Sequence, residues 1–213
     1  MQPCAAQPMP ASRALASAGR ALAHFRRMAE GIDVSPILAE VRDNRALWFV
    51  NQLRQRNIRV HAETNSIELR KGLRPDSTVR LEDCQESAKT AEWQRFPCTT
   101  RILTELAARE AGELARAMLV RLKPQGRVLA HIDHGTYYAR RDRYHLVILS
   151  AQGSEMQCDD ERLVFAQGEF WCFNNKVMHQ AFNRSNDWRI HLIFDLLPIG
   201  RPLHFDRSAG KAE

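Results

Sequence analysis

Residues 127–150 read RVLAHIDHGTYYARRDRYHLVILS and contain three of the chain's eight histidines. Two runs within this stretch carry apolar residues typical of strands, and Gly135 and a pair of arginines lie between them. Successive side chains on a strand point to opposite faces, so His131 and Asp133 project to one side, whereas His134 projects to the other. The stretch therefore predicts two strands, the first of which presents a histidine and a carboxylate together at its end.

The residues around this stretch predict a mainly β fold with added helices. After residue 126 the apolar pattern has a period of two, and glycines and asparagines divide it into short segments. The predicted strands are 127–132, 143–150, 155–157, 162–165, 169–173, 179–183 and 188–197. Short strands at this spacing indicate a sandwich or a closed barrel.

The sequence before residue 124 predicts mostly helices. Residues 13–29 permit a helix, and a serine and a proline near residue 35 begin a second one. Residues 99–122 carry an apolar stripe at helical spacing and predict a long helix that packs against a sheet. Residues 58–72 predict a strand with a break at Thr64-Asn65, and residues 72–98 predict mostly loop.

Two of the predicted strands, 143–150 and 188–197, share an unusual pattern. Each has one wholly apolar face and one face that mixes arginine and histidine with aliphatic residues. A solvent-exposed face is expected to stay polar along its length. The pattern therefore favours a barrel whose apolar outer face is covered by helices and whose interior binds a charged ligand; the alternative is an ordinary exposed face with a few aliphatic residues.

A metal site in such an interior needs a third ligand beside His131 and Asp133. His179 is the candidate, because it begins a later predicted strand after the loop NNKVM. Two histidines and one carboxylate with open coordination positions are the facial triad of non-haem Fe(II) oxygenases. Arg189 lies on the next predicted strand, where a guanidinium can bind a carboxylate through two parallel hydrogen bonds.

Composition and charge exclude several classes of protein. The chain of 213 residues is 44% hydrophobic and 26% charged, as globular domains are. It has no apolar stretch of about 18 residues that could span a membrane, and arginines interrupt any signal peptide. The five cysteines have no CxxC spacing and are read as reduced thiols, so we expect a cytoplasmic protein.

The excess of positive charge leaves the kind of partner open. The net charge is +6 and the pI is about 9.4. A solvated basic face explains most of it, because no basic run is long enough to favour nucleic acid. Tyr137 and Tyr138, next to Arg140 and Arg141, combine aromatic and basic side chains in one cluster. We expect these two arginines to lie at the mouth of the site, where they meet an anionic substrate; the alternative is that they belong to a solvated turn.

Residues 120–198 resemble the aspartyl/asparaginyl β-hydroxylase family of 2-oxoglutarate- and Fe(II)-dependent oxygenases. The matching segments are HID, RYHL, GEFWCFNNKVMHQAFNRS and RIHLIFD. The resemblance implies a double-stranded β-helix core, which is jelly-roll or cupin-like, with N-terminal helices packed on one outer face. The composition of residues 1–12 predicts a disordered tail, and the resemblance implies a single oxygenase domain over 13–213. Within that domain, 13–123 form a helical and substrate-side part, 124–198 the core and 199–213 a C-terminal tail.

The resemblance also assigns roles to six residues. It implies that the catalytic metal Fe(II) is held by His131, Asp133 and His179. It further implies that the cosubstrate 2-oxoglutarate is bound by Arg189 at its distal carboxylate and by Arg143 and His145 at its other end.

The implied reaction uses O2 to hydroxylate an unactivated C–H bond, with succinate and CO2 as by-products. The expected substrate is a small carboxylate-bearing molecule, an amino acid or an Asp or Asn residue of a peptide; the oligomeric state stays open. One alternative is a cupin-like metalloenzyme that does not use 2-oxoglutarate and needs no inward-facing arginines. Another is a non-enzymatic binding module with a structural zinc, which would call for four ligands where the sequence offers three.

Overall fold

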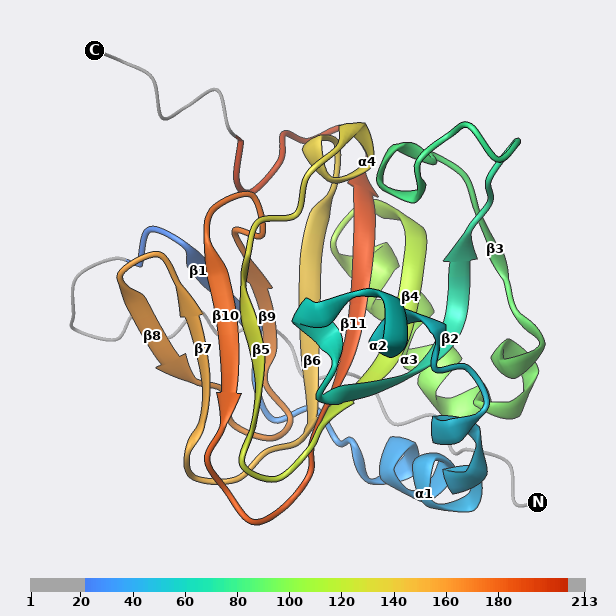
Figure 1. Ribbon diagram of the computed structural model, residues 1–213. Coiled ribbons are helices and arrows are strands. Elements are labelled where there is room, and N and C mark those ends of the chain that lie inside the picture. The colour runs from blue at the N-terminus through green and yellow to red at the C-terminus, as the bar shows by residue number, and fades with distance from the viewer. Residues whose placement is uncertain (1–21, 207–213) are drawn as a thin grey trace.

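The structure, a computed structural model, describes residues 22–206 and is mainly β, with two antiparallel sheets that face each other (Figure 1). The larger sheet has the order β1-β9-β6-β11-β4-β2-β3, and the smaller has the order β5-β10-β7-β8. The strands are β1 Phe25–Ala29, β2 Thr64–Gly72, β3 Ser87–Lys89, β4 Gly112–Leu122, β5 Gly126–His131, β6 Asp142–Leu149, β7 Ser154–Cys158, β8 Glu161–Val164, β9 Phe170–Phe173, β10 His179–Asn183 and β11 Arg189–Pro198.

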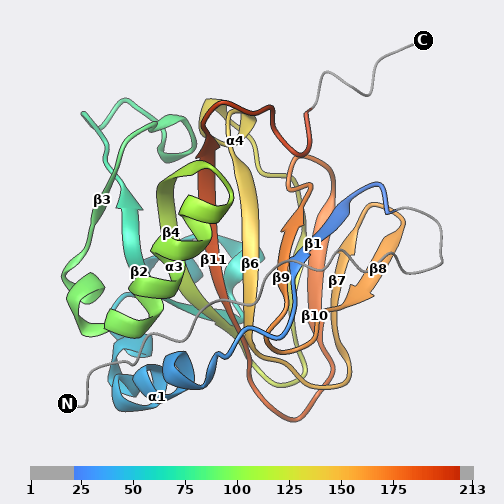
Figure 2. The ribbon, with the colours of Figure 1, turned by 180° about the vertical axis from the view of Figure 1, so that it is seen from behind.

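The helices are short; Figure 2 shows α3 across the back of the larger sheet and α1 beside α3 at one end of that sheet. The α-helices are α1 Ser35–Asp43, α2 Leu53–Asn57, α3 Pro97–Arg109 and α4 Thr136–Ala139. The 3-10 helices are η1 Arg45–Phe49, η2 Arg59–His61, η3 Leu81–Asp83 and η4 Ala91–Arg95.

One hydrophobic core lies between these helices and the larger sheet. It joins Ile37 of α1 and Leu103 of α3 to the outward-facing residues of the central strands, such as Leu146 and Leu192, and all four side chains are fully buried. The apolar faces predicted for β6 and β11 are therefore confirmed. A second core between the two sheets includes Val147 of β6 and other residues from both sheets.

The seven strands predicted after residue 126 are confirmed, each to within one residue at both ends. Before residue 124 several predictions were wrong. The predicted helix 13–29 is contradicted over Phe25–Ala29, which forms strand β1 beside β9; residues 1–21, and with them the predicted tail, lie outside the described residues. The strand predicted over 58–72 begins only at Thr64, after a 3-10 turn.

The long helix predicted over 99–122 is half helix and half strand. The helix α3 ends at Arg109, and Ala111 adopts a positive φ of 46°, which is a common way to end a helix. Gly112 then begins β4, where a Cβ atom would lie 2.7 Å from the Cβ of Leu196. The close packing of β4 against β11 requires a glycine here, so the change from helical to strand pattern comes earlier than residue 124.

Candidate metal centre

A cavity of about 640 Å³ lies between the two sheets, within the usual range of ligand pockets. Every second residue of β4, from Arg116 through Met118 and Val120 to Leu122, lines it. The odd-numbered residues Ala117 and Leu119 point the other way, into the core under the helices. The mixed faces predicted for β6 and β11 also line the cavity, through Arg143 and His145 and through Arg189 and Ile193.

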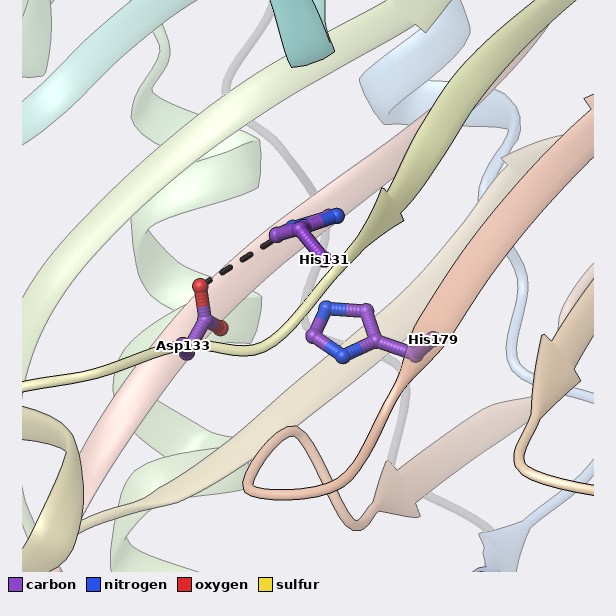
Figure 3. A group of neighbouring side chains, drawn as sticks. All are labelled: His131, Asp133 and His179. Atoms are coloured by element: carbon purple, nitrogen blue, oxygen red, sulfur yellow. Dashed lines mark ion pairs between the residues drawn. The ribbon is translucent and has the colours of Figure 1, made fainter.

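His131, Asp133 and His179 converge on one wall of this cavity (Figure 3). His131 ends β5 and His179 begins β10, and the two residues are direct partners in the antiparallel pair. Asp133 follows two positions after His131, and its Oδ1 lies 3.9 Å from His131 Nε2. One ligand atom from each residue lies within 4.8 Å of the other two. The sequence singled out these three residues, and the structure brings them together.

Backbone carbonyls fix the tautomers of both histidines. The Nδ1 of His131 lies 2.8 Å from the carbonyl oxygen of Leu129, and the Nδ1 of His179 lies 3.0 Å from that of Val177. A carbonyl can only accept, so each Nδ1 carries the proton and each Nε2 keeps its lone pair. Such contacts are typical of histidines that bind a metal through Nε2.

The carboxylate of Asp133 is oriented by two donors on one of its oxygens. Arg143 Nη1 donates to Oδ2 over 2.7 Å, and Asn175 Nδ2 donates to the same atom over 2.9 Å. A backbone hydrogen bond from Asp133 to Asn175 holds the two segments together. Oδ1 is therefore the oxygen left to face the two histidines.

The charges of the group suit a divalent cation at neutral pH. Burial alone would raise the pKa of Asp133, but Arg143 and the neighbouring histidines lower it to about 2. Burial lowers the pKa of His179 to about 4. The carboxylate is thus ionised and this imidazole is neutral, as metal ligands must be.

The donor set fits an open metal site. Two imidazole nitrogens and one carboxylate oxygen are the ligands expected for Fe(II) in oxygenases. Within residues 22–206, no fourth histidine, cysteine or carboxylate joins this group, whereas a structural zinc site is closed by four ligands. All three side chains line the cavity, so a metal held by them would be accessible to small molecules bound there.

A buried arginine lies in the same cavity without a counter-charge. Arg189 of β11 is 6% exposed, and within the described residues it forms no ion pair. Its Nη2 lies 3.3 Å from Nδ1 of His191, and burial lowers the pKa of the guanidinium to about 9. An unpaired buried cation is costly, so the site is built to receive an anion.

Two further histidines complete this pocket. Nδ1 of His145 lies 3.1 Å from Nδ1 of His191, which also faces the guanidinium of Arg189. The shared Nδ1 of His191 must accept from both neighbours, so His145 carries its proton on Nδ1. Burial lowers the pKa of both rings well below the usual value, which keeps them neutral. His145 and Arg189 both line the cavity, whereas His191 supports them from behind.

Arg143 also lines the cavity, but two carboxylates share its guanidinium. Besides Asp133, it donates to Asp195 from Nε over 2.8 Å and from Nη2 over 3.0 Å. Asp195 in turn accepts from the hydroxyl of Tyr137 over 3.1 Å. This role in orienting Asp133 was not visible in the sequence, where Arg143 was assigned to the cosubstrate alone.

The prediction that Arg140 and Arg141 lie at the mouth of the site is wrong. Neither lines the cavity; both lie on a smaller outer groove. Arg141 is buried, with its guanidinium 4.2 Å from the ring centre of Tyr137 and hydrogen-bonded to Gln85. Four other basic residues line the cavity instead, and sequence reasoning missed them: Arg70, Lys71, Arg74 and Arg116.

His61 is another cavity residue that sequence reasoning did not single out. It belongs to η2, and its ring centre lies 5.5 Å from that of His131, edge to face. The tertiary fold brings η2 next to the end of β5, so no local pattern in the sequence identifies His61 as a cavity residue.

No helix among residues 22–206 is long and apolar enough to cross a membrane.

Several solved structures are similar to this chain. A Burkholderia pseudomallei oxidoreductase of the 2OG-Fe(II) oxygenase family matches with a TM-score of 0.48 and 13% identity over 64% of this chain and 69% of that chain. A Pseudomonas putida prolyl-4-hydroxylase matches with a TM-score of 0.48 and 14% identity over 84% of this chain and 95% of that chain. The collagen prolyl hydroxylase of Paramecium Bursaria Chlorella virus-1, in complex with 2OG, matches with a TM-score of 0.47 and 8% identity over 83% and 97% of the two chains.

A search of curated proteins found no significant match. The model of one protein family, described as aspartyl/asparaginyl beta-hydroxylase, matches residues 39–198. This range includes the His-Asp-His group, the three buried arginines of the cavity (Arg116, Arg143 and Arg189) and nearly all of the two sheets. The chain therefore belongs to the aspartyl/asparaginyl beta-hydroxylase family and is an oxidoreductase of the hydroxylase class.

Proposed function

We propose that the protein is a 2-oxoglutarate- and Fe(II)-dependent dioxygenase that hydroxylates an unactivated C–H bond of a small, carboxylate-bearing substrate. The observation that carries this proposal is the combination of an open His-Asp-His group and the unpaired, buried Arg189 in one cavity. The facing sheets support a double-stranded β-helix as the core of the enzyme, with the strands before residue 124 extending the larger sheet.

His131, Asp133 and His179 would hold the Fe(II) ion through two Nε2 atoms and Oδ1. When bound there with 2-oxoglutarate and O2, iron supplies the oxidising power that inserts oxygen into a C–H bond. The protein holds the three ligands in place. Backbone carbonyls bind Nδ1 of each histidine, and Arg143 donates a hydrogen bond to Asp133. Ligands fixed in this way need not reorganise when the substrate binds.

Arg189 would bind the distal carboxylate of 2-oxoglutarate. A guanidinium can grip a carboxylate through two parallel hydrogen bonds, and burial strengthens them because water is excluded. His145, on the neighbouring strand β6, faces the same space. Arg143 would contribute to the other end of the cosubstrate through its positive charge, while its hydrogen bonds keep Asp133 in place.

A cupin-like metalloenzyme without 2-oxoglutarate is the main alternative. Such an enzyme could use the same metal ligands, but it would have no use for a buried cation without a partner. The cost of burying Arg189 is explained only if an anion binds beside it. Within the class of carboxylate-bearing substrates, we propose an amino acid, or an Asp or Asn residue in a peptide.

Anaerobic binding of 2-oxoglutarate to the Fe(II)-loaded protein tests this function. Bidentate binding of a 2-oxo acid to Fe(II) should give a visible charge-transfer band, and admission of O2 should then yield succinate. Zinc-loaded protein is the matched control, because zinc occupies the same ligands without redox chemistry. If neither the band nor succinate forms, the cupin-like alternative is preferred.

A further inference from the structure

The cavity has a second group of arginines at the end opposite Arg189. Arg189 begins β11 and pairs with Leu122 of β4, whereas Phe194 pairs with Ala117. Asp195 is six positions after Arg189, or about 20 Å along the strand. Arg116, which lies beside Ala117 on β4, is therefore at the far end of the cavity, where β11 runs toward α4 (Figure 1).

The metal-ligand group lies nearer to Arg116 than to Arg189 along β11. Asp133 is hydrogen-bonded to Arg143, and Arg143 is the partner of Asp195 in the β6–β11 pair. His145, two positions further along β6, pairs with Ile193 and contacts His191. His191 in turn contacts Arg189. A molecule bound at the far arginines would thus lie next to the metal-ligand group, on the side away from Arg189.

Arg116 is buried without a counter-charge. It is 6% exposed, and within the described residues it forms no ion pair. Its guanidinium lies 3.7 Å from the ring centre of Tyr137, and Nη2 donates to the carbonyls of Leu81 and Cys84. Its Nε is buried and has no hydrogen-bond partner. Two carbonyls hold the group in position, but they do not neutralise it.

Arg70, on the adjacent strand β2, is partly buried and lies close enough to Glu113 for the charge of that carboxylate to raise its pKa, although burial lowers it more. It pairs with Ala117 across the sheet, and its side chain bonds only to Ser87 and to the carbonyl of Ala115. No carboxylate among the described residues forms an ion pair with it. We call Arg70 and Arg116 the arginine end of the cavity.

The carboxylates near the arginine end are mostly engaged elsewhere. Asp133 and Asp195 are both bound to Arg143, and Glu82 forms an ion pair with Arg80. Lys71 and Arg74 line the same part of the wall and add positive charge, which leaves Glu68 as the one lining carboxylate on β2. Four cationic side chains against one such carboxylate make this part of the wall positive, which favours an anionic group.

We propose that Arg70 and Arg116 form a subsite for a carboxylate of the substrate, separate from the one that binds the cosubstrate. The inference rests on the proposed function and adds the position of the substrate. Because the two cationic groups lie at opposite ends of the cavity, the two anions stay apart. A substrate fixed by its carboxylate at the arginine end would present a C–H bond further along its length to the metal.

The test compares carboxylates with their amides as probes. Probe pairs are the free amino acids with their primary amides, and peptides with free or amidated C-termini. Succinate formation by the Fe(II)-loaded enzyme is measured with each member. We expect one carboxylate series to stimulate turnover with a KM about 10- to 100-fold below that of its amides. Whether amino acids or peptides respond identifies the source of the carboxylate.

Substitutions of Arg70 and Arg116 test whether the carboxylate binds at the arginine end. Arg70→Gln and Arg116→Lys should raise the KM for the stimulating carboxylate about 10-fold or more, while the KM for the cosubstrate stays unchanged. Arg116→Lys could fold poorly, because it loses hydrogen bonds to the carbonyls of Leu81 and Cys84. In that case Arg70→Gln alone tests the subsite. Arg140→Gln is the matched control, because Arg140 is exposed and does not line the cavity.

Calorimetry with zinc-loaded protein and the same probe pairs reports binding without turnover. The subsite is overturned if acids and amides behave alike, if no carboxylate probe binds or stimulates, or if the Arg70 and Arg116 variants match Arg140→Gln. A wild-type protein that binds carboxylate probes at the arginine end but forms no succinate from 2-oxoglutarate would instead contradict the proposed function.

Discussion

Nη1 of Arg143 lies 2.7 Å from Oδ2 of Asp133, while the other two nitrogens of the same guanidinium bind Asp195. One buried cation therefore joins the metal-ligand group to the wall of the larger sheet. The second donor on Oδ2 is Asn175, which lies on the loop before His179. The orientation of Asp133 thus depends on residues from three separate segments of the chain.

Removal of one hydrogen-bond donor to Asp133 should weaken metal binding without unfolding the protein. Asn175→Ala deletes the hydrogen bond to Asp133 but leaves Arg143 in place, so the affinity for Fe(II) or Co(II) should fall about 10-fold or more. Titration calorimetry measures it. Asn174→Ala is the control, because Asn174 lies in the same loop and has no contact with Asp133. Equal affinities of the two variants would show that Asn175 does not position the carboxylate.

Metal binding should stabilise the folded protein. At a free metal concentration about 100 times Kd, the gain is about 2.7 kcal/mol, or a rise in Tm of about 5–10 °C. His179→Ala should abolish this rise, because two ligands remain. His134→Ala should keep it, since His134 is exposed and outside the cavity. A metal-dependent rise that survives in His179→Ala would mean that the metal binds elsewhere, and scanning calorimetry with and without a chelator decides it.

Much of the metal site could be predicted from the sequence, because it depends on local geometry. The two-residue spacing of His131 and Asp133 places both on one side of the chain, and their convergence with His179 follows from one strand pair. The arginine end could not be predicted in this way. The second half of the segment 99–122 has helix-forming residues, and its strand conformation is imposed by pairing with β2 and β11. Only in the strand does Arg116 point into the cavity.

For Arg140 and Arg141 the sequence predicted a position at the site that the structure does not show. Adjacent arginines next to tyrosines suggested a basic surface at the site, but position along the sequence does not say on which side of a turn a side chain lies. The helix α4 turns Arg141 away from the cavity and under Tyr137. Tertiary contacts, here with Gln85, decided the outcome.

Gly135 should be needed for the connection between Asp133 and the start of α4. Its φ is +100°, and a Cβ atom here would collide with the carbonyl oxygen of Glu82. Gly135→Ala should therefore destabilise the protein by about 2 kcal/mol or more, through backbone strain and this clash. Gly200→Ala is the control: φ is +68°, but nothing lies within 4 Å of the added methyl group, so only the strain of about 1 kcal/mol applies. Urea denaturation compares the two, and an equal loss would rule out the clash.

Arg189→Met should separate stability from cosubstrate binding. Methionine fills much of the same volume without a charge, and the wild-type guanidinium has no counter-charge in the described residues. Removal of this charge should leave the free energy of unfolding unchanged or raise it, because the cost of desolvating the cation disappears.

The same substitution should abolish 2-oxoglutarate binding, with a loss on the order of 2–5 kcal/mol, since the buried anion would lose its partner. Arg201→Met is the control with the opposite result: Arg201 lies 2.8 Å from the buried Asp142, so its loss should cost about 2 kcal/mol or more of stability while 2-oxoglutarate still binds. Urea denaturation and the anaerobic charge-transfer titration measure the two properties separately. Wild-type affinity for 2-oxoglutarate in Arg189→Met would show that the unpaired guanidinium serves another anion.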